Sequence, residues 1–256
     1  GATFRTERAD VNTEFVRSPD NWFHPVNFVN APDGTLYCID MAREYSETAN
    51  IPPDVEKHMD LTSGRDRGRI YRVAPPGFRQ PPPPRLGRAS TAELVSALES
   101  SHGWWRDTAH RLLYERQDKS AVPALERLVI QSGSPQARVH ALWSLLGLQA
   151  LSDRAIVTGL GDSHPGVREN AVRMAEARLG AAGEIREKIM ALVSDPEPRV
   201  RLQVAFTIGE SRQWNQPALL ARVARENLED PWIQSAVISS AAECGGEVFA
   251  AVAADA

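Results

Sequence analysis

The sequence predicts a mostly α-helical protein: a right-handed α-solenoid of repeated helical pairs, preceded by a small antiparallel β segment. Three observations predict this class. Residues 91–256 are rich in Ala, Leu, Arg and Glu, with apolar positions at helical spacing. The same residues contain five similar segments at a nearly constant interval, as repeat architectures do. Residues 1–74 instead carry short apolar runs separated by Pro, Asp and Gly, a pattern typical of β-hairpins.

Composition divides the chain into three parts. We expect an incomplete β domain at residues 1–74, a proline-rich linker at 75–90, and about five repeats at 91–256, the last one truncated. The run Pro81–Pro84 favours polyproline II and cannot continue a helix, so the linker is interpreted as a semi-rigid spacer. A docking motif for an aromatic groove is the alternative.

The first β feature is a hairpin. The runs VNFVN (26–30) and TLYCID (35–40) flank Ala31–Gly34, where Pro presets φ and Gly accepts a positive φ. A further strand is expected at Arg69–Val73. Three or four strands make one sheet and not a complete barrel or propeller. We therefore expect this region to belong to a larger domain or to pack against the repeats.

The repeats become visible when five helical segments are aligned. Their common position is occupied by Arg106, Arg138, Arg168, Arg201 and Gln234, at spacings of 32, 30, 33 and 33 residues. A small or β-branched apolar residue follows three positions later: Ala109, Ala141, Ala171, Val204 and Val237. Such residues allow neighbouring helices to approach closely. Proline-containing turns precede most of these segments, as expected at helix starts.

Another helical stretch lies before each of these segments, at 91–99, 121–131, 151–160, 184–194 and 215–227. The unit is therefore a helix, a short turn and a second helix. One such pair cannot bury its apolar face alone, so neighbouring pairs are expected to stack.

Two turns carry an Asp six residues before the aligned Arg: Asp162 before Arg168, and Asp195 before Arg201. This D-x-x-P-x-V-R pattern resembles HEAT repeats of the short bacterial type. The resemblance implies an Asp–Arg ladder between repeats, formed by Arg106, Arg138, Asp162, Arg168, Asp195 and Arg201. The ladder would be partial, because Ser100 and Ser132 replace two acidic members and Gln234 replaces the last Arg.

Three runs carry a more specific resemblance: SPDNWFHPVNFVNAPDGTLYCIDMAREYSE (18–47), LTSGRDRGRIYRV (61–73) and GWWRDTAHRLLYERQD (103–118). Together they resemble the last propeller blade and first repeats of the planctomycete-type membrane-bound dehydrogenase family. That family's propeller is similar to soluble glucose dehydrogenases that use pyrroloquinoline quinone. The resemblance implies a periplasmic or cell-envelope location, with pyrroloquinoline quinone, calcium and c-type haem as cofactors of the parent protein and none in this chain.

The functional hypothesis follows from these resemblances. The chain is expected to be a fragment of a larger bacterial redox protein, in which a HEAT-like solenoid binds or scaffolds beside a quinone-dependent sugar or alcohol dehydrogenase-like propeller. The partners would be proteins or neighbouring domains of the same polypeptide. The alternative is a free-standing HEAT-repeat adaptor with no redox role. No catalytic residue is assigned in this chain, which starts at Gly1 and ends on an apolar segment.

Bulk properties limit other functions. The net charge of −4 and the lack of a basic, aromatic-interleaved face argue against nucleic acid as a partner. No apolar run reaches the ~20 residues of a membrane-spanning helix, so no transmembrane segment is expected. Cys38 and Cys244 lie in unrelated contexts and are interpreted as reduced thiols; the chain contains no CxxCH haem motif.

Several side chains are weighed as cofactor or partner contacts. His24, Arg65 and Arg67 are candidate cofactor-binding residues, because a basic cluster extended by Arg69 and Arg72 could grip a quinone carboxylate. The alternatives are a packed turn for His24, and solvated pairing with Asp60 and Asp66 for the arginines.

Two further groups have structural and functional readings. Asp33, Asp40 and Glu44 could gather around Ca²⁺, although the turn alone explains Asp33. Trp104 and Trp105 are either a partner anchor or packing residues at the first repeat. The histidines His110, His140 and His164 lack i, i+4 spacing, so no helical zinc site is expected.

Overall fold

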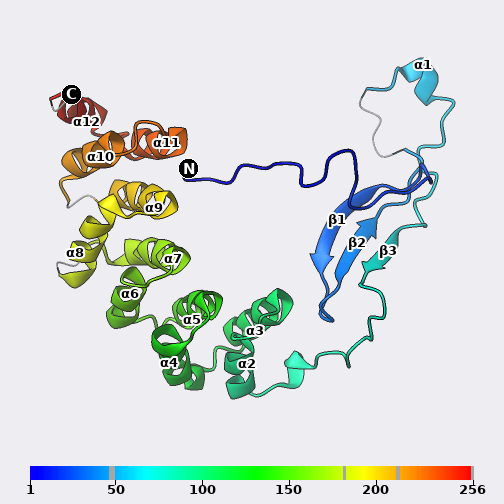
Figure 1. The fold of residues 1–256 in the computed structure, drawn as a ribbon, viewed down its shortest axis with the longest axis horizontal. Coiled ribbons are helices and arrows are strands. Elements are labelled where there is room, and N and C mark those ends of the chain that lie inside the picture. Colours follow the sequence, from blue (N-terminus) through cyan, green and yellow to red (C-terminus); the bar gives the residue numbers. More distant parts are fainter. Residues whose placement is uncertain (46–49, 181–182, 212–213, 255–256) are drawn as a thin grey trace. The chain divides into compact units, whose positions relative to one another are not determined.

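The computed structural model describes residues 1–45, 50–180, 183–211 and 214–254. These residues form a mostly helical protein with one small antiparallel sheet, which confirms the coarse prediction of fold class. The chain divides into two compact units (Figure 1). The helical unit comprises Gly1–Thr6, Leu86–Ser101 and Arg106–Ala256, and the sheet unit comprises Glu7–Arg85 and His102–Trp105. Residues 46–47, at the end of the run 18–47, lie outside the described residues.

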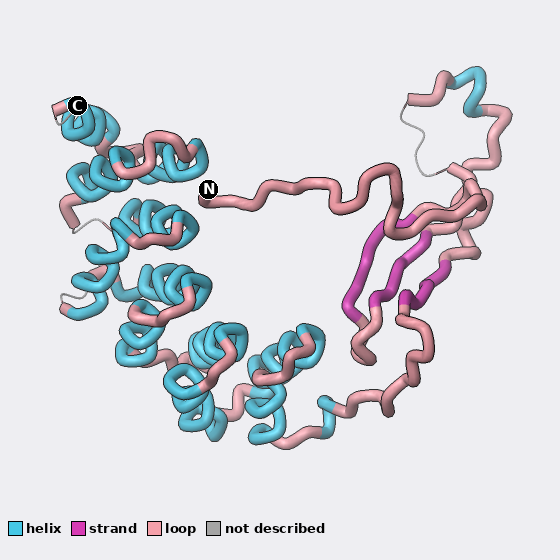
Figure 2. The backbone as a smooth tube through the Cα atoms, viewed as in Figure 1, coloured by secondary structure: helices cyan, strands magenta, loops and turns pink. Residues whose placement is uncertain are grey.

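The sheet contains three antiparallel strands in the order β1-β2-β3: β1 (Pro25–Asn30), β2 (Leu36–Asp40) and β3 (Arg69–Val73) (Figure 2). The β1–β2 turn follows the predicted chemistry. Gly34 has a φ of +87°, and the Asp33 carboxylate accepts the Thr35 backbone N–H at 3.0 Å and the Thr35 hydroxyl at 2.6 Å. The hairpin and third strand were therefore predictable from local sequence.

Burial is sparse in the sheet unit. All six residues of β1 are exposed, and the side chains of Ile70 and Tyr71 on β3 are exposed as well. Cys38 and Ala42 are fully buried. Gly64, with a φ of +81°, lies so close to the backbone that an added Cβ would stand 2.3 Å from the Ala42 carbonyl oxygen. A short helix, α1 (Pro53–Glu56), completes the regular structure of this unit.

The longer helices all follow residue 90. They are α2 (Thr91–Ala97), α3 (Gly103–Arg116), α4 (Val122–Gln131), α5 (Pro135–Gly147), α6 (Asp153–Leu160), α7 (Pro165–Ala175), α8 (Glu184–Ala191), α9 (Pro198–Gly209), α10 (Gln216–Arg225), α11 (Pro231–Ser240) and α12 (Gly245–Ala253).

The helix starts have identifiable local causes. Proline occupies the first position of α5, α7, α9 and α11, where its missing N–H leaves no bond unmade. Side-chain caps precede several helices: Ser134 accepts the Ala137 N–H at 3.2 Å, and Ser90 forms a capping box with Glu93. The helices α5 and α7 therefore begin two residues before the predicted segments 137–146 and 167–176. The helix α12 was not predicted.

The helices of this unit pack as pairs that stack in chain order. α4 pairs with α5, α6 with α7, and α10 with α11. The helices α5, α7, α9 and α11 stack on one another along the inner side of the curved unit (Figure 1), and we call them the inner layer. The helices α4, α6, α8, α10 and α12 form the outer layer.

The core between the layers is apolar and closely packed. Leu142, Leu145, Ile208 and Leu220 are fully buried, with no exposed surface. An added Cβ at Gly159 would lie only 2.8 Å from the Cβ of Ala171, so glycine allows α6 and α7 to approach closely. Deletion of buried methylene groups from such a core costs stability through lost contacts and through the cavity that remains.

Two further expectations concern chemistry and membranes. Cys38 and Cys244 are both free thiols, as the sequence predicted. Burial raises the pKa of the Cys244 thiol, and Glu247 and Glu243 add to this effect. No helix within the described ranges has the length and apolar character that a bilayer crossing requires.

Candidate functional site

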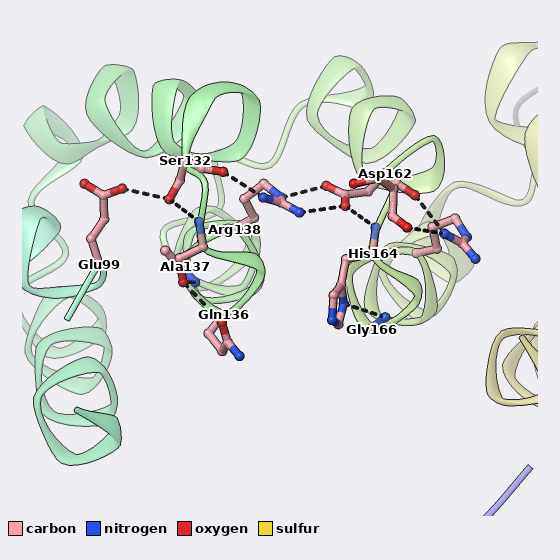
Figure 3. Close-up of polar contacts among 11 residues, drawn as sticks. Glu99, Ser132, Gln136, Ala137, Arg138, Asp162, His164 and Gly166 are labelled. Atoms are coloured by element: carbon pink, nitrogen blue, oxygen red, sulfur yellow. Dashed lines mark hydrogen bonds and ion pairs between the residues drawn. The ribbon is translucent and has the colours of Figure 1, made fainter. Parts of the chain in front are cut away.

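Two arginines on successive inner-layer helices each form a bidentate ion pair with an Asp of the following repeat. Arg138 on α5 donates through Nε and Nη2 to the two carboxylate oxygens of Asp162, at 2.7 and 2.8 Å (Figure 3). Arg168 on α7 makes the same two-pronged contact with Asp195, at 2.8 Å for both bonds. The structure thus brings together four of the six proposed ladder residues as two buried ion pairs.

Each ladder residue also holds its own repeat together. The Nη1 group of Arg138 donates to the Ser132 carbonyl at 2.7 Å, and that of Arg168 donates to the Asp162 carbonyl at 2.9 Å. The Asp162 carboxylate accepts the backbone N–H of His164 at 2.8 Å, which closes the turn before α7 (Figure 3). The hydrogen bonds that Arg168 donates to Asp195 raise the pKa of Arg168 above its usual range. Arg138, Asp162, Arg168 and Asp195 therefore each join two repeats and also bond within one turn.

The ladder changes character at its two ends. Ser132 occupies the place of an acidic member, and its hydroxyl donates to the Glu99 carboxylate at 2.7 Å. Arg106 donates to the Ser100 carbonyl at 2.7 Å, within its own repeat. At the other end, Arg201 donates through Nε to the side-chain oxygen of Asn227 at 2.8 Å.

Asn227 is a ladder member that sequence reasoning missed. It lies seven residues before Gln234 and not six, so the spacing that found Asp162 and Asp195 passes over it. Its side chain is buried, and its amide also donates to the Val223 carbonyl at 2.7 Å. A polar residue in the turn between a helix end and an Asp-Pro helix start is the signal that could have pointed to it.

Polar side chains also join neighbouring inner-layer helices at their surface. Trp143 on α5 donates through its indole N–H to Asn170 on α7 at 2.8 Å. Arg199 on α9 pairs with Glu169 on α7 at 3.0 Å. Further contacts of the same kind are those from Gln203 to Glu176 at 3.1 Å and from Thr207 to Glu176 at 2.9 Å.

Two large aromatic side chains on the inner layer remain open to solvent. Phe206 on α9 is 42% exposed and Trp232 on α11 is 57% exposed. Aromatic and arginine side chains are enriched where protein interfaces gain most of their binding energy. The inner layer therefore combines polar contacts that hold neighbouring helices together with aromatic residues that are exposed to solvent.

A histidine pair lies between α3 and α5. The rings of His110 and His140 are 5.6 Å apart, His110 Nδ1 lies 2.9 Å from the Ser144 hydroxyl, and His140 Nε2 lies 3.6 Å from Asp107. Burial lowers the pKa of both imidazoles. His164 lies elsewhere, where its Nδ1 accepts the Gly166 N–H at 3.1 Å.

The candidate cofactor residues of the sheet unit have ordinary local contacts. His24 donates its backbone N–H to Asp40 at 2.8 Å, and its Nδ1 lies 3.1 Å from the Trp22 carbonyl oxygen. Arg65 and Arg67 are exposed. In the described part of this unit, no hydrogen bond or ion pair joins His24 to either arginine.

The remaining basic residues have partners of their own. Arg69 donates to the Tyr71 hydroxyl at 3.1 Å and lies 3.7 Å from Asp20. Arg72 contacts Asp33 at 3.3 Å, and its guanidinium lies 5.6 Å from the centre of the Phe78 ring. Arg69, Arg72 and His24 are thus held by separate contacts, and no described contact joins these residues and the exposed Arg65 and Arg67 into one anion site.

The proposed calcium ligands are likewise used locally. Asp33 closes the β1–β2 turn, and its hydrogen bonds from Thr35 lower the pKa of its carboxyl. Asp40 is 1% exposed and accepts the backbone N–H of Ala42 at 2.9 Å. Glu44 raises the pKa of Tyr45 beside it. Across the described ranges, no three His, Cys, Asp or Glu side chains come together in a way that could hold a metal ion.

Trp104 and Trp105 form an edge-to-face pair with ring centres 6.4 Å apart. Within the sheet unit, Trp105 donates its indole N–H to the Pro32 carbonyl at 3.2 Å. Both tryptophans are half-buried, which agrees with packing residues.

Comparison with known proteins finds one family model and several similar solved chains. A family model described as "Domain of unknown function (DUF7133)" matches residues 1–77, which is less than half of the chain. No curated protein matches. One similar solved chain belongs to "Structural Basis of Microtubule Plus End Tracking by XMAP215, CLIP-170 and EB1". It shares 15% identity over 62% of this chain and 87% of that chain, with a TM-score of 0.38, and we draw no functional argument from it.

Proposed function

We propose that residues 91–256 form a right-handed α-solenoid of HEAT-like repeats that binds a protein partner, or a neighbouring domain of the same polypeptide, through its inner layer. The observation that carries this proposal is the inner-layer surface, where inter-helix polar contacts such as Arg199–Glu169 fix the helices beside exposed Phe206 and Trp232. A prearranged surface loses little conformational entropy on binding, and exposed aromatic residues supply large apolar contact area.

A pair of matched substitutions tests this proposal. Phe206→Glu places a charge on the inner layer, whereas Ile130→Glu places the same charge on the outer helix α4, at a residue that is 53% exposed. Proteins captured from extracts of the source organism are quantified for both variants and for the unchanged chain. We expect a partner that Phe206→Glu loses and Ile130→Glu retains. Equal capture by all three chains would remove the inner layer as the binding surface.

A second proposal concerns the larger protein. The three runs that resemble the planctomycete-type membrane-bound dehydrogenase family support a parent oxidoreductase of the periplasm or cell envelope, to which β1–β3 contribute part of the last propeller blade. The candidate residues do not fit a quinone site, because His24 bonds within its own turn and to Asp40, whereas Arg65 and Arg67 are exposed and no described contact joins them to it. We therefore assign no redox step, and no binding of quinone, calcium or haem, to residues of this chain.

The test of this second proposal uses the full-length parent protein. Reduction of an artificial dye is followed with sugars and alcohols, with and without pyrroloquinoline quinone and Ca²⁺. Quinone-dependent reduction would support the redox role. Inactivity with every substrate in the reconstituted protein would favour the alternative, a HEAT-repeat adaptor with no redox role.

A further inference from the structure

Residues 1–6 belong to the helical unit and contact its inner layer. The N label in Figure 1 lies beside α9 and α11, and the segment contacts Arg199 on α9 and Asp230, the residue that caps α11. Ala2 retains only 2% of its accessible surface, although the segment forms neither helix nor strand. A short irregular segment with a small side chain that is almost fully covered resembles a bound peptide.

The first contact uses one carboxylate twice. Asp230 caps α11 through Oδ1, which accepts the backbone N–H groups of Trp232 at 3.0 Å and Ile233 at 3.2 Å. Its second oxygen, Oδ2, accepts the backbone N–H of Ala2 at 2.7 Å. Burial alone would raise the pKa of Asp230, but these N–H donors keep it below its usual range. The helix cap therefore leaves one ionised oxygen for a peptide N–H.

The second contact is aromatic. The guanidinium of Arg199, near the start of α9, lies 4.8 Å from the centre of the Phe4 ring. Arg199 is held in place by Glu169 on α7 at 3.0 Å. A guanidinium within about 6 Å of a ring centre is attracted by the ring's electron-rich face. Phe4 remains 82% exposed, so Arg199 covers one face and leaves room for a larger partner.

The contacts of residues 1–6 run from one repeat to the next. The chain bends at Thr3, between the two contacting residues Ala2 and Phe4. Ala2 meets the start of α11, and Phe4 meets the start of α9.

We propose that Glu169, Arg199 and Asp230 form a peptide site for a segment with a small residue followed two positions later by an aromatic one, and that residues 1–6 occupy this site in cis. This inference rests on the proposed function and specifies the partner's chemistry. A partner segment of the same pattern must displace residues 1–6 before it binds. A tethered segment acts at an effective concentration of about 1 mM, so its displacement requires a partner that binds more tightly or is abundant.

The test keeps the full chain and opens the site. Ala2→Glu with Phe4→Ala places a large anion at a covered position beside Asp230 and removes the ring over Arg199. A labelled peptide of residues 1–6, acetylated at its amino terminus, is titrated by fluorescence polarisation into the opened chain and the unchanged chain. We expect the opened chain to bind with a Kd below about 1 mM, and the unchanged chain to bind at least about 5-fold more weakly, since its own segment competes.

Controls separate specific binding from general attraction. In the opened chain, Arg199→Ala should weaken peptide binding about 3-fold, whereas Arg127→Ala on the outer helix α4 should not change it. A peptide with Phe4→Ala should lose a similar factor. Circular dichroism melts confirm that each variant remains folded.

Three results would overturn the inference: no binding to the folded opened chain at about 1 mM peptide, equal binding to opened and unchanged chains, or equal effects of Arg199→Ala and Arg127→Ala. A partner that the capture experiment shows to depend on Phe206, together with a negative peptide titration, would refute only this site. If neither a Phe206-dependent partner nor peptide binding is found, the proposed function is refuted as well.

Discussion

The two units of this chain differ in how many of their apolar side chains are buried and in how their charged side chains are paired. In the helical unit, both layers contribute fully buried apolar residues, and the charged groups inside it, such as Asp195, are paired. In the sheet unit, every residue of β1 and most of β3 is exposed, and the buried apolar side chains of its described residues are the small ones of Ala31, Cys38 and Ala42. The comparison teaches that stacked helical pairs complete their own core, whereas three strands do not.

The same difference explains which unit needs neighbours. Stability of a stacked repeat comes from its own hairpin and from the next one along the chain. A small sheet is stable only when one of its faces is covered, for example by a helix that packs against it. If the helical unit is stabilised by its own core and the sheet is not, substitutions in the two units should differ in their effect on stability.

The largest effect is expected at the ladder. Asp195→Ala leaves Arg168 without its carboxylate partner and opens the turn at Glu197, whose N–H the carboxylate accepts at 2.9 Å. Removing one member of a buried ion pair costs about 4 kcal/mol of unfolding free energy. Urea denaturation followed by circular dichroism measures the loss. The control is Asp153→Ala, which removes an exposed pair with Arg178 and should cost less than about 1 kcal/mol.

The apolar core should respond almost as strongly. Leu142 on α5 is fully buried, so Leu142→Ala should lower the unfolding free energy by about 3 kcal/mol. Leu146 lies one turn later on the same helix and is 38% exposed. Leu146→Ala should therefore cost clearly less. Similar losses for both variants would show that α5 is packed on both faces.

Acid should weaken the helical unit at the histidine pair. Burial lowers the pKa of His110 and His140 from 6.5, so the unfolded chain binds protons first as the pH falls. Stability is complete above pH 6.5 and decreases below it, until the folded-state pKa values are reached. Urea midpoints between pH 8 and pH 5 measure this slope.

The matched variants for this pH effect are His140→Gln and His58→Gln. The first removes one of the half-buried imidazoles and should flatten the pH dependence of stability. The second removes an exposed histidine of the sheet unit and should leave the slope unchanged. An unaltered slope in His140→Gln would show that the acid sensitivity arises elsewhere.

The smallest effect is expected on the sheet. Ile70 on β3 is 67% exposed, so Ile70→Ala should change the unfolding free energy by less than about 0.5 kcal/mol. Hydrogen exchange of the β2 and β3 amides measures local stability directly. A loss above about 1 kcal/mol would mean that Ile70 is covered in solution, which would remove the contrast between the units.

Much of the fold was readable because its signals are local. The hairpin at Ala31–Gly34, the strand Arg69–Val73 and most helix positions follow from turn residues and periodicity. The helix α12 escaped prediction, since its residues are small and apolar with no cap or periodic polar face. The placement of residues 1–6 is a long-range contact with residue 230, which no local pattern encodes.

The candidate site was predictable only where the repeat spacing is regular. Asp162 and Asp195 stand six residues before an arginine and meet the arginine of the preceding repeat. Asn227 breaks that spacing, and the surface contacts Trp143–Asn170 and Arg199–Glu169 join residues 27 and 30 positions apart. Composition alone cannot show which side chains of adjacent helices will face each other. The division into residues 1–74, 75–90 and 91–256, and the roles of propeller and cofactors, stay predictions.

The ladder gives the helical unit a direction, like a polymer joined head to tail. Arg138 and Arg168 each donate forward to the carboxylate of the next repeat, and Asp162 and Asp195 each accept from the repeat before, so a repeat such as Asp162–Arg168 carries one acceptor and one donor. Such units are interchangeable in order but not in orientation. Excision of residues 162–194 would bring Asp195 to the place of Asp162, where Arg138 would find a carboxylate of the same kind. Whole repeats can therefore be added or removed while the Arg–Asp contact between neighbouring repeats is kept.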